Sequence, residues 1–147
     1  MKSLKSNKGF TLVELVVVIA ILGILAGIAI PRFLDATASA RGAKIVADMR
    51  TIESGETIYY AKYAKYPTGT DDANFTALVQ GGWPTPPTGS FTIAKTLVST
   101  GGVTSGSAAT AYAYTAGAND NPGTLKLTCT GADANGKTLT ELLGGKS

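Results

Sequence analysis

Hydrophobic residues dominate the chain from Phe10 to Ile30, where the only charged side chain is Glu14. At about 1.5 Å of rise per residue, a helix over this run would cross the roughly 30 Å of hydrocarbon in a bilayer. Gly23 and Gly27 are four positions apart and would give one face of that helix a close-packing surface. The pattern predicts a membrane-spanning helix with one carboxylate near its start.

The pattern changes after Pro31, where apolar residues recur every three or four positions with charged residues between them. This spacing predicts an amphipathic helix that continues the first one. Because proline lacks a backbone donor, Pro31 should kink or interrupt the helix, and Pro67 should end it at Tyr66. The apolar positions are Phe33, Leu34, Ile45, Met49, Ile52, Tyr59 and Tyr63, and Gly42 and Gly55 mark places where backbones should pack closely.

The remainder of the chain is rich in turn-forming residues, interrupted by short runs in which polar and apolar residues alternate. These features predict a connector anchored by Trp83 and a small antiparallel sheet that packs on the amphipathic half of the helix. The expected fold class is α+β. The predicted elements are a short helix at 73–79, strands at 91–98, 111–115 and 124–130, and a final helix or strand at 138–143.

The net charge of +3 belongs to the first nine residues, in which three lysines are the only charged side chains. The other ten Lys and Arg residues are balanced by ten Asp and Glu residues. A basic N-terminal head fits the positive-inside rule for membrane helices. The neutral remainder gives no support to a nucleic acid partner, which we do not expect.

The residue types of common catalytic and zinc sites are scarce. There is no histidine, and Cys129 is the single cysteine, so the chain has neither a histidine base nor an intrachain disulfide. Cys129 alternates with threonine and lysine, which predicts a buried strand residue. We interpret residues 133–136 as a turn, with a calcium loop as the alternative there and at 119–121. We expect no enzyme activity, no metal and no cofactor.

Glu14 needs a partner, because a carboxylate in an apolar helix is costly in a bilayer. A cut after Gly9 would leave Phe10 with a free α-amino group four residues before Glu14. If copies of the chain are staggered lengthwise, the amine of one copy meets the carboxylate of the next inside a poorly screened bundle. The hypothesis is that Phe10 and Glu14 are filament assembly residues.

The run Lys8-Gly9-Phe10-Thr11-Leu12-Val13-Glu14-Leu15, followed by the hydrophobic helix with its Pro31, resembles the class III signal of type IV pilins and pseudopilins. The resemblance is specific over residues 8–31 and looser as far as Pro67. It implies that a prepilin peptidase cuts between Gly9 and Phe10 and methylates the new terminal Phe10. It also implies that the helix can lose helicity between its glycines, Gly23 and Gly27, and Pro31 as a filament forms.

The resemblance further implies a pilin fold and a structural role. Its parts would be a leader at 1–9, a long helix at 10–66 and a globular domain at 67–147, with the helix divided into a transmembrane part at 10–31 and an amphipathic part at 32–66. The chain would be a single-pass precursor in the inner membrane. The pilus assembly machinery would then build it, as a homo-oligomer, into an extracellular pilus or a periplasmic pseudopilus.

Other interpretations stay open. The filament could be an adhesive or motile pilus, a type II secretion pseudopilus or a DNA-uptake pilus. The chain could instead be a membrane-anchored or secreted binding module. An ordinary signal peptide could be cut after Ala38 or Ala40, but the length of the apolar run and its Glu14 argue against it. Many type IV pilins close a C-terminal loop with a disulfide, a pattern from which a chain with Cys129 alone departs.

Overall fold

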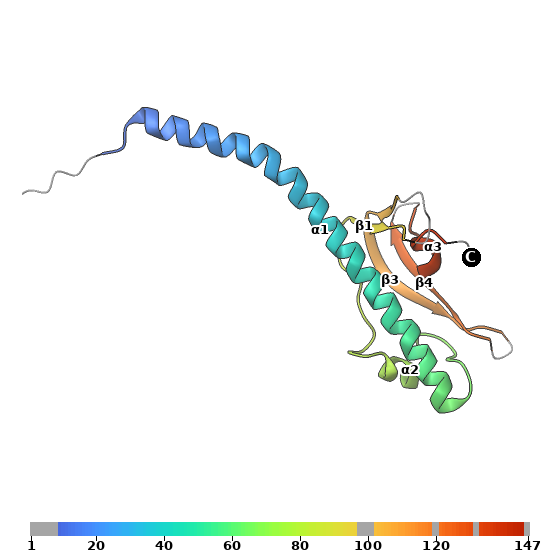
Figure 1. Cartoon of the computed structure of the whole chain (residues 1–147). Helices are drawn as coiled ribbons and strands as arrows, with labels where there is room; N and C mark the ends of the chain where they lie inside the picture. Colours follow the sequence, from blue (N-terminus) through green and yellow to red (C-terminus); the bar gives the residue numbers. More distant parts are fainter. Residues whose placement is uncertain (1–8, 97–101, 119–120, 131–132, 146–147) are drawn as a thin grey trace, which may run out of the picture. The chain divides into compact units, whose positions relative to one another are not determined.

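A computed structural model of the protein describes residues 9–96, 102–118, 121–130 and 133–145. The chain divides into two compact units, Met1–Ala36 and Thr37–Ser147. One helix, α1 (Leu12–Tyr63), runs through the boundary between them. The rest of the regular structure belongs to the second unit (Figure 1). The α+β class and the pilin-like combination of a long helix with small antiparallel sheets are confirmed.

The helix α1 is amphipathic only over its second half. Its buried residues are spaced three or four apart and therefore lie on one face: Gly42, Ile45, Met49, Ile52, Gly55 and Tyr59. Phe33 and Leu34, which the spacing assigned to the same face, are 68% and 60% exposed. α1 continues through Pro31, so the loss of one backbone donor does not end the helix.

The end of α1 is set by Ala64, which has a φ of 52°. This left-handed conformation is incompatible with another helical turn. Ala64 also donates its N–H to the carbonyl of Tyr60 over 2.8 Å, which closes the last turn. The helix therefore ends at Tyr63, three residues before the predicted end at Tyr66.

Two antiparallel pairs of strands replace the single predicted sheet. Strand β1 (Phe91–Ala94) pairs with β2 (Val103–Gly106), and β3 (Ala108–Thr115) pairs with β4 (Thr124–Thr130). The prediction missed β2, because its sequence lies in a segment of small, turn-favouring residues and only pairing with β1 makes it a strand. The predicted first strand ended at Val98, but β1 ends at Ala94, and residues 97 and 98 lie outside the described residues.

Two short helices complete the domain, and each begins with a side-chain cap. Asp72 caps α2 (Ala73–Leu78) by accepting the N–H groups of Asn74 and Phe75. Thr138 and Glu141 form a capping box at the start of α3 (Leu139–Leu142), which settles the open choice between helix and strand there.

One hydrophobic core joins these elements to the second half of α1. It takes Ile45, Met49 and Ile52 from α1 and Phe75 from α2, together with inward-facing strand residues. Trp83 is partly buried against this core, and its ring lies 5.6 Å from that of Phe75, in agreement with its predicted anchoring role. The strand residues in the core are Phe91, Ile93, Ala109, Tyr112, Tyr114, Leu125, Leu127 and Cys129.

Candidate assembly site at the head of the long helix

The first turn of α1 is closed by a reciprocal pair of side-chain hydrogen bonds. The N–H of Thr11 donates to Oε2 of Glu14 over 2.9 Å, and the N–H of Glu14 donates to Oγ1 of Thr11 over 3.2 Å. The Thr11 hydroxyl donates to the same Oε2 over 2.8 Å. This is the geometry of a capping box, in which two otherwise unpaired donors at a helix start are satisfied.

Glu14 was predicted from the sequence as a functional residue, but Thr11 was missed. The signal was present, since Thr11-Leu12-Val13-Glu14 is a threonine followed three residues later by glutamate at the start of an apolar run. Such a motif predicts a helix beginning immediately after the threonine, which is where α1 begins.

Gly9 and Phe10 lie outside the helix, directly before the capping box. Both are exposed, and Phe10 is exposed over 91% of its surface. The peptide bond between them is therefore not enclosed in helical structure. The leader residues 1–8 lie outside the described residues.

No other described segment of the first unit packs against the apolar half of α1. Its large hydrophobic side chains, from Leu12 to Leu34, are exposed over about half or more of their surface. α1 is long and apolar enough to cross a membrane, and none of its most apolar stretch is buried. A Cβ added at Gly23 or Gly27 would meet no atom within 4 Å, so this face is open to another helix.

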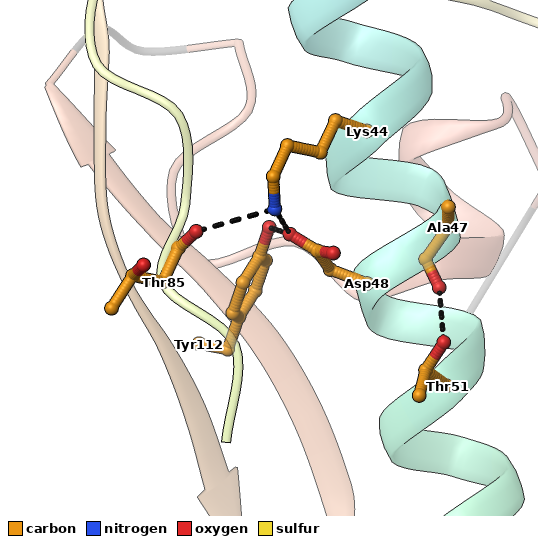
Figure 2. Close-up of polar contacts among 6 residues, drawn as sticks. All are labelled: Lys44, Ala47, Asp48, Thr51, Thr85 and Tyr112. Carbon is orange, nitrogen blue, oxygen red and sulfur yellow. Dashed lines mark hydrogen bonds and ion pairs between the residues drawn. The ribbon is translucent and has the colours of Figure 1, made fainter. Parts of the chain in front are cut away.

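The second half of α1 is joined to the domain by acidic side chains that accept hydrogen bonds from tyrosines. Figure 2 shows Asp48, which forms an ion pair with Lys44 one turn away and accepts the Tyr112 hydroxyl over 2.8 Å. Lys44 also donates to the carbonyl of Thr85 in the connector over 3.4 Å. Helix, connector and β3 therefore meet at one polar contact beside the core.

A second contact of this kind lies two turns further along α1. Glu56 accepts the Tyr114 hydroxyl over 2.6 Å and the N–H of Gly123 over 2.8 Å. Burial, with the hydrogen bond to a carboxylate as the next cause, raises the pKa of Tyr114, and likewise that of Tyr112 beside Asp48. Both phenols are thus held protonated.

The end of α1 is tied to the connector by Asp72. This carboxylate accepts the Tyr59 hydroxyl over 2.8 Å as well as the two N–H groups at the start of α2. Burial alone would raise the pKa of Asp72, but these hydrogen bonds together outweigh it and lower the pKa. The same bond raises the pKa of Tyr59. The sequence pattern placed Tyr59 in the core but did not reveal its partner.

Two predictions in the C-terminal part are confirmed. Cys129 lies on β4, is buried and unpaired, and burial raises its thiol pKa. Residues 133–136 form a turn in which Asn135 accepts the N–H of Cys129 over 3.1 Å. Of the second calcium candidate, Asn119 and Asp120 lie outside the described residues. Within the part of the chain that is described, no three Cys, Asp or Glu side chains are grouped as a metal site would require.

Comparison with known proteins finds a match at the start of α1. A family model described as the prokaryotic N-terminal methylation motif matches residues 4–30, which contain the Thr11–Glu14 box and the whole apolar run from Phe10 to Ile30. In this segment the chain is similar to type IV pilins and pseudopilins.

The curated relatives include both type IV pilins and a type II secretion protein. The chain is 42% identical over 67 residues to the type IV major pilin protein PilE1 of Neisseria gonorrhoeae, covering 46% of this chain and 41% of that one. It is 39% identical over 64 residues to the type II secretion system core protein G of Klebsiella michiganensis, covering 44% and 45%. A fimbrial protein of Pseudomonas aeruginosa is 45% identical over 51 residues, covering 35% and 33%.

The matches therefore span less than half the length of these curated relatives. No solved structure matches the chain at a significant level.

Proposed function

We propose that this chain is the structural subunit of a type IV pilus-like filament. It is inserted in the cytoplasmic membrane through residues 10–31, cut by a prepilin peptidase between Gly9 and Phe10, and methylated on Phe10. The processed subunits then leave the membrane and assemble as a helical homo-oligomer at the cell surface.

The observation that carries this proposal is the exposure of the apolar first half of α1, which follows directly after Glu14. Outside a bilayer, an apolar helix of this length is stable only if other apolar surfaces cover it. Copies of the same helix provide such a surface, and Gly23 and Gly27 let two helices approach closely. One helix therefore serves as membrane anchor before assembly and as filament core afterwards.

Assembly needs a device that sets the lengthwise stagger between subunits. In the proposal, the Glu14 carboxylate of one subunit pairs with the Phe10 α-amine of a neighbour. Opposite charges attract strongly where water is excluded, whereas an unpaired carboxylate there is strongly disfavoured. A wrong stagger leaves both charges unpaired, so the pair selects one register.

A second candidate is a periplasmic pseudopilus of type II secretion. The observation that favours it is the similarity to a type II secretion core protein, which is nearly as high as that to the pilins. Both filaments would use the same processing and the same charge pair. Where the filament is found, outside the cell or within the envelope, separates them.

Processing is tested by intact mass and N-terminal sequencing of protein sheared from the cell surface. We expect a chain that begins at Phe10 and is one methyl group heavier than its sequence. A chain that begins after Ala38 or Ala40, or that keeps Met1, would overturn the proposal and leave a secreted or anchored binding module in its place.

The charge pair is tested by Glu14→Ala in the full chain. We expect normal cleavage and membrane insertion but a loss of filaments of at least about tenfold, because the neighbour's amine loses its partner. Glu53→Ala removes another exposed carboxylate of α1 and should assemble like the parent. Normal filaments from Glu14→Ala would show that the charge pair does not direct assembly.

A further inference from the structure

The uncovered half of α1 carries charge at its far end as well as at its start. Over residues 10–40 the charged side chains are Glu14, Arg32 and Asp35. Arg32 and Asp35 are both exposed, and neither forms an ion pair within the described residues. Cleavage would add the α-amine of Phe10, so this segment would hold two positive and two negative groups.

Arg32 and Asp35 are poorly placed to pair with each other in one helix. The base precedes the acid by three positions, whereas helical ion pairs are more stable when the acid comes first. When neighbouring copies cover the exposed apolar side chains beside them, both charges lose contact with water. A charge that is left unpaired in such a setting is strongly disfavoured. Each of the two therefore needs a partner on another copy.

One lengthwise stagger of two parallel copies supplies both partners. The proposed pair of Glu14 with a Phe10 amine, the head pair, joins residues four positions apart and so shifts one copy along the other by about 6 Å. Arg32 precedes Asp35 by three residues, so a pair between them needs a shift of about 4.5 Å in the same direction. The two shifts differ by about 1.5 Å, which is small beside the length of an arginine side chain.

The charges also lie on matching faces of the helix. Asp35 follows Glu14 by 21 residues, which at about 3.6 residues per turn places the two acids about 60° apart around the axis. Arg32 follows Phe10 by 22 residues, which is close to six whole turns. These counts hold because α1 is continuous through Pro31. The acids of one copy thus share a face, and the positive groups share a face of the next copy.

We infer that Asp35 of one copy of this chain pairs with Arg32 of the next copy in the filament. This inference rests on the proposed function and adds a second charge pair to the register that the head pair would set. The two pairs lie roughly 30 Å apart along the helix. They therefore hold both ends of the apolar segment at one stagger and leave no charge in it without a partner.

The test uses two charge reversals in the full chain, Arg32→Asp and Asp35→Arg. Each variant alone places like charges opposite each other between copies, and we expect at least about tenfold fewer filaments per processed copy. Expressed together, the two variants complement each other, because each chain presents the charge that the other lacks. Their mixed filaments should return to within about twofold of the parent. Pairing within one helix cannot produce this rescue, since each variant carries two like charges.

A matched control and a milder variant accompany this comparison. Glu53→Arg reverses an exposed charge in the second half of α1 and should assemble like the parent. Asp35→Asn removes the charge without introducing repulsion, so its loss of filaments should be smaller than that of Asp35→Arg. Copies that are cleaved and inserted in the membrane are counted first, which separates assembly from the earlier steps.

The outcomes distinguish this inference from the proposed function. If the two reversed chains assemble no better together than alone while Glu14→Ala is also defective, the second pair is overturned and the head pair stands. Normal filaments from each reversed chain alone would overturn the second pair as well. If the reversed chains complement each other but Glu14→Ala assembles normally, Arg32 and Asp35 set the register and the head pair is removed.

Discussion

Gly42 brings the backbone of α1 directly against the backbone of β1. A Cβ built at this position would overlap the carbonyl oxygen of Thr92, which cannot move without shifting the strand. Gly55 is different, because the atom nearest to a Cβ added there is Cγ2 of Val79 at 3.0 Å, the end of a side chain. Two glycines on the same buried face thus have unequal tolerance for a methyl group.

This difference gives a matched pair of substitutions. Gly42→Ala should destabilise the domain by about 2–3 kcal/mol, because overlap with a backbone atom exceeds the gain in helix propensity. Gly55→Ala should stay within about 1 kcal/mol of the parent, since that gain offsets a small shift of Val79. Denaturant unfolding of the full chain in detergent, followed by near-ultraviolet circular dichroism, measures both. Equal stabilities would contradict the close backbone contact at Gly42.

At the residue scale, the sequence predicted which residues are buried or closely packed better than it predicted which atoms they contact. Gly42 and Gly55 were expected to mark close backbone packing on the amphipathic helix, and Cys129 was expected to be buried because it alternates with threonine and lysine along a strand. Their partners were not predictable, since Thr92, Val79 and Asn135 come from other turns or strands. Which atoms meet depends on how the chain folds back on itself, and no local pattern encodes that.

At the scale of elements, β3 contacts α1 through side chains that are two residues apart on the strand. Tyr112 and Tyr114 point to the same side of β3, and their hydroxyl groups reach Asp48 and Glu56 on the helix. Each ring lies in the core while its hydroxyl meets a carboxylate, which is the usual way in which a buried tyrosine is satisfied. The position of β3 on α1 is therefore fixed by two polar contacts as well as by packing.

These contacts predict how the domain responds to high pH. Burial and a neighbouring carboxylate raise the pKa of both phenols, so the folded domain binds their protons more tightly than the unfolded chain does. The stability that they confer is complete below the ordinary tyrosine pKa of about 10 and decreases as the pH rises further. The domain should therefore unfold in alkali only at a pH well above the ordinary tyrosine pKa.

Spectrophotometric titration of the six tyrosines checks this expectation. The phenolate signal should remain incomplete until the domain unfolds, and the variant with Tyr112→Phe and Tyr114→Phe should lose most of that delayed fraction. Tyr59, whose pKa is also raised through its bond to Asp72, accounts for the rest. Titration of all phenols near pH ~10 with the fold intact would contradict both contacts.

Prediction of the elements succeeded where a local pattern was strong and failed where pairing decides. The long helix, α2, β3 and β4 follow from periodicity and capping residues that lie within each segment. β2 has a single large apolar residue, Val103, beside threonine, serine and glycine, and becomes a strand through β1. The end of α1 was misplaced because the break comes from the backbone conformation of Ala64 rather than from the following proline.

For the whole molecule, the core lies entirely on one side of the boundary at Ala36. The buried hydrophobic residues run from Ile45 to Leu143, and none of the described residues before Thr37 is buried. Residues 37–147 therefore hold every core contact that is described. The exposed apolar first unit adds nothing to that core.

This division predicts that a chain starting at Thr37 folds without the first unit. We expect a monomer that is soluble without detergent and has the near-ultraviolet circular dichroism spectrum of the full chain, because its core is complete. Size-exclusion chromatography and circular dichroism test the two parts of the prediction. An unfolded or aggregated fragment would show that the domain depends on contacts with residues before Thr37.

The features that could be predicted from the amino-acid sequence are those that depend on local composition. An uninterrupted apolar run, a single acid at its head and the change of pattern after Pro31 are properties of consecutive residues, and water or lipid acts on them directly. The tertiary structure alone decided the pairing of β2 with β1, the tyrosine contacts of Asp48 and Glu56, and the close approach at Gly42. These depend on segments far apart in the chain, whose meeting is favourable only when the whole core forms at once.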